Sequence, residues 1–327
     1  MSADAVSIWF EALESLDEFI GIRYGVLQPE SPDIHWEYRS HKKHDGIGAF
    51  AEILREDGLL VNDLPQITHP AKTSLLKTLT LASGALTPRR RVDWSDDFKK
   101  NANAKPDESP DQPPECFAWH LFDAGNTREI LRASRLIDVT VNSFLLRCLD
   151  KAIRPDIADR SSCLPWMIPV NLRGHLSGLG DTENQSAAVM VHTHPEQRFE
   201  TLHQSVYEKL RKGEHWSVWE NYKLSSGLPL DAKKKLILAD RAMPRWNIGS
   251  FSNLGVWNLP ESFDDNAYVF MPPVLRCQWL GAGALTYKGK LGLAIQAHPC
   301  IATNPEVAEQ WMRRWVDEIA VSIPADN

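Results

Sequence analysis

Apolar residues recur at helical spacing in several parts of the chain, and this pattern predicts most of its helices. The amphipathic segments that we expect to be helical are residues 6–20, 48–57, 72–83, 199–212, 230–242 and 305–323. A polar turn with Pro29 and Pro32 separates the first of these from an alternating run at 34–40, which predicts a strand. Pro305 suits the first turn of the last helix, because its fixed backbone angle is compatible with that position.

The second half of the chain mixes strands with helices. A helix is predicted from Asn126 to about Leu136, and a strongly apolar helix that starts on Thr140 or Asn142 follows it. Strands are predicted at 115–122, 164–174 and 291–298, and residues 183–191 are predicted as a loop that enters another apolar strand. A short strand at 249–255 closes on a polar turn, and two strands within 266–287 are joined by a Gly-Ala-Gly turn. This order of elements predicts an α+β fold.

A polar stretch rich in proline, residues 88–114, is the best candidate for a domain boundary. We therefore expect an N-terminal lobe over residues 1–87, a linker over 88–114 and a C-terminal lobe over 115–327. The linker begins with Arg89, Arg90 and Arg91, which are interpreted as a solvated charge run in preference to a phosphate site.

Composition narrows the functional class. The 327 residues are 43% hydrophobic and 24% charged, with a net charge of −7, which argues against nucleic acid as an obligatory partner. No apolar run approaches the roughly 20 residues of a membrane span, and the first residues lack the apolar region of a signal peptide. Five scattered cysteines, without C-x-x-C spacing, indicate reduced thiols. We expect a cytoplasmic protein.

The candidate catalytic residues lie between the predicted strand at 34–40 and the predicted helix at 48–57. His41, Asp45 and Gly46 form an H-x-x-x-D-G pattern there. A histidine at near-neutral pKa can act as a general base, the aspartate can fix the loop through an arginine, and glycine lets the backbone turn. The alternative is a polar strand-to-helix turn with a solvated histidine.

Several further segments follow this motif in a characteristic order. They are Thr140–Leu146, Pro169–Arg173 followed by Asn184 and Gln185, Ser252–Gly255, and Leu285–Leu291. Together with the first motif they resemble the chloramphenicol acetyltransferase-like superfamily of CoA-dependent acyltransferases, which includes condensation domains and the alcohol and wax-ester acyltransferases. The resemblance implies a two-lobed fold of mixed β-sheets covered by helices.

Two departures from the superfamily pattern concern the first lobe. Its members have a longer stretch before the histidine motif, so the resemblance implies an incomplete first lobe, through a truncated start or a reduced variant, whose sheet would have an unpaired edge. Many members also carry a second histidine immediately before the motif, where this chain has Ser40.

The resemblance assigns roles to individual residues. His41 would be the general base, with Gly46 completing the motif, and Asp45 would form a structural salt bridge with Arg173. Ser252 and Asn253 are candidates to stabilise an oxyanion, against an ordinary Ser-Asn turn, and Asn184 is a candidate to line the channel or fix a loop. His44, His192 and His194 lack acidic or cysteine partners at metal-binding spacing, so no metal is expected.

The implied reaction moves an acyl group from a thioester to a hydroxyl or amine. No permanently bound cofactor is expected; acyl-CoA or an acyl-carrier thioester would be the co-substrate, and an alcohol or amine the acceptor. The competing interpretation is a non-catalytic condensation-like domain that binds a carrier protein or a partner chain. A third is a fragment of a multi-domain synthetase.

Overall fold

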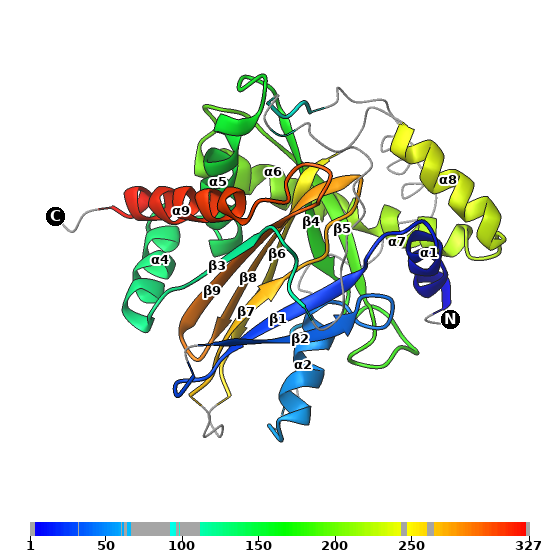
Figure 1. The fold of residues 1–327 in the computed structure, drawn as a ribbon, viewed down its shortest axis with the longest axis horizontal. Helices are drawn as coiled ribbons and strands as arrows, with labels where there is room; N and C mark the ends of the chain where they lie inside the picture. The colour runs from blue at the N-terminus through cyan, green and yellow to red at the C-terminus, as the bar shows by residue number, and fades with distance from the viewer. Residues whose placement is uncertain are drawn as a thin grey trace.

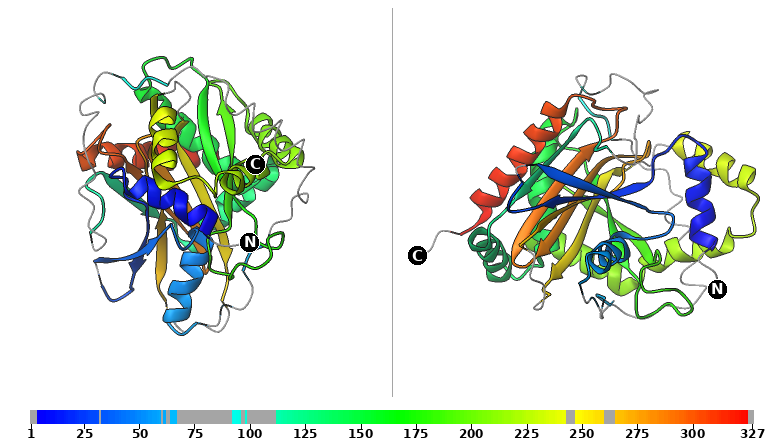
Figure 2. Two further views of the ribbon diagram at one scale, coloured as in Figure 1. Left: turned by 90° about the vertical axis from the view of Figure 1, so that its right-hand side faces the viewer. Right: turned by 60° about the horizontal axis from the view of Figure 1, so that its bottom comes forward.

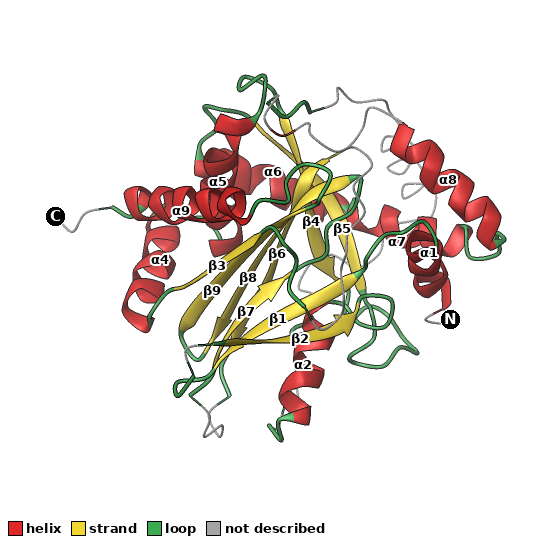
Figure 3. Ribbon diagram, in the orientation of Figure 1, coloured by secondary structure: helices red, strands yellow, loops and turns green. Residues whose placement is uncertain are grey.

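The computed structural model describes residues 4–31, 33–59, 61, 64–66, 92–95, 98, 112–242, 247–259 and 265–324. In this part of the chain, the strands form two sheets, and helices pack around them (Figures 1 and 3). The predicted helix at 72–83 and most of the predicted linker lie outside the described residues. No described helix is long and apolar enough to cross a membrane.

A six-stranded mixed sheet forms the centre of the molecule, in the order β3-β9-β8-β6-β4-β5. β6 runs parallel to both of its neighbours, β8 and β4, whereas the remaining pairs are antiparallel. The strands are β3 (Phe117–Leu121), β4 (Leu164–Asn171), β5 (Ser186–Thr193), β6 (Asn247–Trp257), β8 (Gln278–Tyr287) and β9 (Lys290–Ala297).

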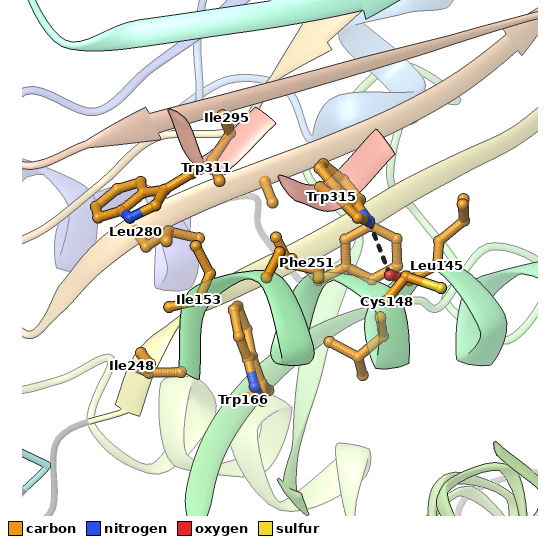
Figure 4. Packing of buried hydrophobic residues seen from close by; sticks show 14 of the residues in the cluster. Leu145, Cys148, Ile153, Trp166, Ile248, Phe251, Leu280, Ile295, Trp311 and Trp315 are labelled. Atoms are coloured by element: carbon orange, nitrogen blue, oxygen red, sulfur yellow. Dashed lines mark hydrogen bonds between the residues drawn. The ribbon is translucent and has the colours of Figure 1, made fainter. Parts of the chain in front are cut away.

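Four helices cover one face of this sheet and enclose the main core (Figure 1). They are α4 (Ala124–Leu136), α5 (Val141–Ile153), α6 (Phe199–Lys212) and α9 (Pro305–Ser322). Trp311 and Trp315 of α9 are fully buried between the sheet and α5, and the indole Nε1 of Trp315 donates to the Leu145 carbonyl over 3.0 Å (Figure 4). Burial of side chains of this size contributes about 1.5–3 kcal/mol each.

The opposite face carries a three-stranded antiparallel sheet in the order β2-β1-β7. Its strands are β1 (Gly21–Leu27), β2 (Ile34–Ser40) and β7 (Ala267–Met271), so a strand from the second half of the chain completes the first lobe. β7 lies so close to the central sheet that a Cβ on Gly283 would be 1.9 Å from the Phe270 carbonyl oxygen. Glycine is therefore required inside β8, and the turn predicted at Gly281-Ala282-Gly283 is wrong.

Helix α2 (Gly46–Glu56) packs against β1 and β7 through a second core. Phe50 of this helix stacks on Tyr24 of β1 with ring centroids 5.4 Å apart. The apolar positions of α2 recur every three or four residues, which is why the sequence predicted this helix. Its packing fixes the turn that precedes it, where the H-x-x-x-D-G motif lies.

Three further helices lie together beyond β5 (Figure 2). They are α1 (Asp4–Glu14), α7 (His215–Leu224) and α8 (Leu230–Ala242). The Nε1 of Trp9 donates to the Ser225 hydroxyl over 2.6 Å and ties α1 to the end of α7. The helix predicted at 6–20 thus ends at Glu14.

The described part of the predicted linker packs against the C-terminal lobe. Trp94 is buried, its backbone forms a bridge with Ile157, and its ring lies 5.5 Å from that of Trp311. Phe98 stacks on the same Trp311 ring at 5.9 Å. These two aromatic side chains anchor the segment in the main core, and the proposed domain boundaries remain a prediction.

Candidate active site

The H-x-x-x-D-G motif forms the tight turn between β2 and α2. Asp45 is the N-cap of α2: its backbone is extended, and its Oδ1 accepts from the Gly48 amide over 2.9 Å. An aspartate is favoured there because the first amides of a helix lack intrahelical partners and carry partial positive charge. The Tyr24 hydroxyl donates to the Gly46 carbonyl over 2.5 Å and fixes the turn from the side of β1.

Asp45 and Arg173 form a buried bidentate ion pair. The two terminal nitrogens of Arg173 donate to Oδ2 and Oδ1 of Asp45 over 2.8 and 2.9 Å. Only 3% of Asp45 and 4% of Arg173 is exposed. The Gln185 amide adds a further hydrogen bond to Oδ2 over 2.8 Å. The carboxylate of Asp45 is therefore satisfied as an ion, in an arrangement suited to holding the turn.

The remaining donors of Arg173 bind the loop that precedes β5. Its Nε donates to the Asp181 carbonyl over 2.8 Å, and its terminal nitrogens also reach the Glu183 carbonyl and the Asn171 side-chain oxygen, over 3.0 and 3.2 Å. All five N–H groups of a guanidinium are thus used. Arg173 joins the end of β4, the loop at 180–185 and the motif turn into one unit.

The loop at 180–185 also contacts the motif turn directly. The Nδ1 of His44 lies 2.9 Å from the Thr182 carbonyl oxygen, and the Asn184 amide donates to the Lys43 carbonyl over 3.0 Å. A Cβ on Gly48 would lie 2.1 Å from the same Thr182 oxygen. The approach of this loop to α2 therefore depends on glycine at position 48.

His41 is oriented by its own turn. Its Nδ1 lies 2.8 Å from the His44 carbonyl oxygen, which can only accept, so we assign the ring proton to Nδ1. The neutral ring then has its lone pair on Nε2. The His41 ring lies against Phe10 of α1, with centroids 4.9 Å apart. Burial is the main cause that lowers the pKa of His41 below its usual value of 6.5, which keeps the ring neutral near pH 7.

Asn184 fixes the backbone of the motif. The Nδ2 of Asn184 donates to the His41 carbonyl over 2.8 Å and lies 3.3 Å from Nδ1 of the His41 ring. Its Oδ1 accepts from the amide and the hydroxyl of Ser186, over 3.1 and 2.8 Å. Of the two roles considered from the sequence, this geometry corresponds to loop fixing.

Ser252 and Asn253 lie in the middle of β6. The strand continues to Trp257, so it does not close at Gly255 as the sequence predicted. A register shift against β8 begins after Asn253, and Gly255, with φ of +81°, uses its conformational freedom there. The Asn253 side chain accepts from the Gly255 amide over 2.9 Å. Within the described residues, no hydrogen bond joins Ser252 or Asn253 to His41.

The residues that sequence reasoning missed are Phe10, Tyr24 and Thr182. Phe10 and Tyr24 are apolar positions of a helix and a strand, and Thr182 acts through its carbonyl oxygen. No motif distinguishes them in the sequence. Burial raises the pKa of Tyr24 well above its usual value, so its hydroxyl stays a neutral donor to the turn.

Two buried thiols are unsuited to nucleophilic chemistry. Burial raises the pKa of Cys116 to about 11 and that of Cys148 to about 12. A thiolate is the reactive form of cysteine, so both side chains stay protonated near neutral pH.

No protein-family model and no curated protein matches the sequence. Solved structures do match the fold. The EpoB cyclization-docking bidomain of a nonribosomal peptide synthetase from Sorangium cellulosum matches with 11% identity and a TM-score of 0.54, over 88% of this chain and 60% of that chain.

Two more neighbours extend the comparison. The starter condensation domain of rhizomide synthetase RzmA, in complex with C8-CoA and Leu-SNAC, matches with 12% identity and a TM-score of 0.53, over 89% of this chain and 66% of that chain. The TRI3 trichothecene 15-O-acetyltransferase from Fusarium sporotrichioides matches with 14% identity and a TM-score of 0.54, over 98% of this chain and 75% of that chain. The expected two-lobed chloramphenicol acetyltransferase-like fold is confirmed.

Proposed function

We propose that the protein is an acyltransferase that moves an acyl group from a CoA or carrier-protein thioester to a hydroxyl or amine, with His41 as general base. One observation carries the proposal: the Nδ1 of His41 is held by the His44 carbonyl over 2.8 Å, which leaves Nε2 as the basic nitrogen. The fold supports it, because the chain resembles condensation domains and an acetyltransferase in structure. A cytoplasmic reaction is part of the proposal.

The proposed step is a proton transfer coupled to attack on the thioester. The acceptor O–H or N–H gives its proton to Nε2 of His41 as the oxygen or nitrogen bonds to the thioester carbon. The tetrahedral intermediate then collapses, the carbon–sulfur bond breaks, and the imidazolium returns the proton to the departing sulfur. The lowered pKa of His41 favours the neutral ring that this cycle starts from.

The oxyanion of this intermediate needs a hydrogen-bond donor. Ser252 is our candidate, since it is mostly buried, with 8% exposed, and none of the described residues accepts or donates a hydrogen bond to its hydroxyl. Asn253 is the weaker candidate, because its side-chain oxygen is already used by the Gly255 amide.

The alternative function, a non-catalytic domain that binds a carrier protein or partner chain, is favoured by one feature. β2 is the outermost strand of its sheet, and among the described residues it pairs only with β1. An unpaired strand edge can accept a strand from another chain. The chain spans between 60% and 75% of the length of the three structures described above.

A thiol-release assay separates the two functions. A panel of acyl-CoAs is offered with small alcohols and amines, and free thiol is measured with and without the acceptor. The acyltransferase proposal requires acceptor-dependent release that His41→Ala abolishes, and slower release by Ser252→Ala would support Ser252 as the oxyanion donor. Release that no acceptor stimulates, with tight binding of an acylated carrier protein, would favour the binding function.

A further inference from the structure

Strands β4 and β6 form a fork that opens toward the motif turn. They pair only at Trp166 with Gly249 and at Met167 with Ser250. Beyond these pairs β4 continues to Asn171, paired with β5, and β6 continues along β8. The facing edges of β4 and β6 therefore diverge beyond these two pairs, although the two strands run in the same direction.

A cavity of about 390 Å³ occupies this fork on the side of α5 and α6. Its size falls in the usual range for small-molecule sites, about 300–1,000 Å³. Apolar side chains form most of the wall, among them Ile168, Val170, Val189, Val206 and Leu210. Apart from His203 and Tyr207, no titratable side chain lines it, so it suits an uncharged group, because an ion without a partner is costly to bury.

The mouth of the fork adjoins the candidate active site. Asn171, at its β4 side, accepts from the backbone amide and a terminal nitrogen of Arg173, over 3.0 and 3.2 Å. Asn253 and Gly255, at its β6 side, flank Leu254, whose Cδ2 would lie 2.7 Å from a Cβ on Gly46. Both rims of the cavity therefore lie next to residues that contact the motif turn.

A polar chain reaches the cavity from the start of α5. The Thr140 hydroxyl lies 3.1 Å from the Ser143 hydroxyl, which lies 3.2 Å from Nδ1 of His203 on α6. Either hydroxyl orientation is allowed, so the His203 ring can carry its proton on Nδ1 or on Nε2. No described residue pairs with Nε2, which can therefore accept from a ligand or donate to one.

We propose that this fork is a binding site for an uncharged, mainly apolar chain that carries a hydroxyl or carbonyl oxygen, recognised by Nε2 of His203. The inference deepens the proposed acyltransferase function, because such a chain arrives either as the acyl group of the donor or as the body of the acceptor alcohol. Val206 and His203 lie on α6 and face the same cavity, so the apolar and polar parts of recognition can be changed separately.

Binding is measured by titration calorimetry, without turnover. The donor probes are acetyl-CoA, octanoyl-CoA and ω-hydroxyoctanoyl-CoA, and the acceptor probes are octanol and octane-1,8-diol. Val206→Trp fills the cavity and should weaken the octyl probes of the set that occupies the fork, acyl-CoAs or alcohols, by about tenfold or more while acetyl-CoA binds unchanged. His203→Leu should remove the preference for the hydroxylated probe of each pair, which we expect to be about tenfold. Gln204→Ala, at an exposed position of the same helix, is the control.

The two probe sets identify the source of the chain. Discrimination among the acyl-CoAs assigns the fork to the donor, and discrimination among the free alcohols assigns it to the acceptor. Octyl probes that bind equally to Val206→Trp and the parent protein, with the variant folded by circular dichroism, would overturn the proposal. Because binding needs no chemistry, a failure of His41 as base would leave this result intact.

Discussion

Arg173 donates to both carboxylate oxygens of Asp45, over 2.8 and 2.9 Å, across 128 positions of the sequence. The pair joins the motif turn of the N-terminal lobe to the end of β4 in the central sheet. Both partners also bind backbone of the loop at 180–185: Asp45 accepts from the Gln185 amide, and Arg173 donates to the carbonyls of Asp181 and Glu183. The position of His41 depends on this junction.

Removal of one partner should therefore destabilise the protein. Asp45→Ala leaves the Arg173 guanidinium buried without its counter-ion, and we expect a loss of about 3–5 kcal/mol in the free energy of unfolding. Activity should fall with it, through loss of the folded site. Urea denaturation followed by circular dichroism measures the change. Arg313→Ala, which breaks an exposed ion pair with Glu309, is the control and should have a far smaller effect. Unchanged stability of Asp45→Ala would refute the structural role.

Gly48→Ala tests the close approach of the loop at 180–185. Alanine is normally the better helix former by up to about 1 kcal/mol. At this position its Cβ would lie 2.1 Å from the Thr182 carbonyl oxygen, so we expect a lower melting temperature. Gly227→Ala, where a Cβ meets nothing within 4 Å, should be neutral or slightly stabilising. A Gly48→Ala variant as stable as its parent would mean that the loop does not pack against α2 as described.

The pH dependence of turnover should reflect the protonation of His41. Because burial lowers the pKa of this residue, the acid limb of kcat/KM should have its midpoint below 6.5. The free energy of unfolding should likewise decrease toward acid pH. The unfolded chain binds the His41 proton more readily, so the contribution of His41 is intact above about pH 6.5 and is lost as the pH falls through its folded pKa. Titration of the ring by NMR measures that pKa directly, and a value above 6.5 would contradict the burial argument.

Asn184→Ala should slow catalysis because it removes contacts that position His41. The variant loses the hydrogen bond to the His41 carbonyl and two more to Ser186, so we expect a stability loss of about 1–3 kcal/mol. Misplacement of the base should lower kcat by up to about a hundredfold. Asn126→Ala, on the exposed start of α4, serves as the matched control. If the Asn184 variant keeps its kcat, its contact with the motif has no part in positioning the base.

Local pattern was sufficient for the elements that carry the motif. The alternation at 34–40 matched β2 residue for residue, and the predicted helix at 48–57 corresponds to α2. The apolar helix predicted from Thr140 or Asn142 is α5, with Thr140 as its N-cap. Asp45 and Arg173, paired on the basis of resemblance, are in contact.

The features that could not be predicted from the sequence depend on tertiary packing. Gly281 and Gly283 resembled a turn, but they lie in β8 where β7 passes too close for a Cβ. β1 escaped notice because its residues are almost all buried, which removes the alternation that marks a strand with one exposed face. The fork between β4 and β6 leaves no local signal, since it arises from how two strands distant in sequence diverge.

The most direct test of the account is thiol release by His41→Ala, measured on the acyl donor and acceptor that the parent protein prefers. His35→Ala is the matched control, since that histidine lies on β2, the strand that leads into the motif turn, with 70% of its side chain exposed. We predict that His41→Ala loses about a hundredfold to ten-thousandfold in turnover while its melting temperature and its binding of acyl-CoA are kept, and that His35→Ala matches the parent. Turnover by a folded His41→Ala variant at the parent rate would contradict the assignment of His41 as the base.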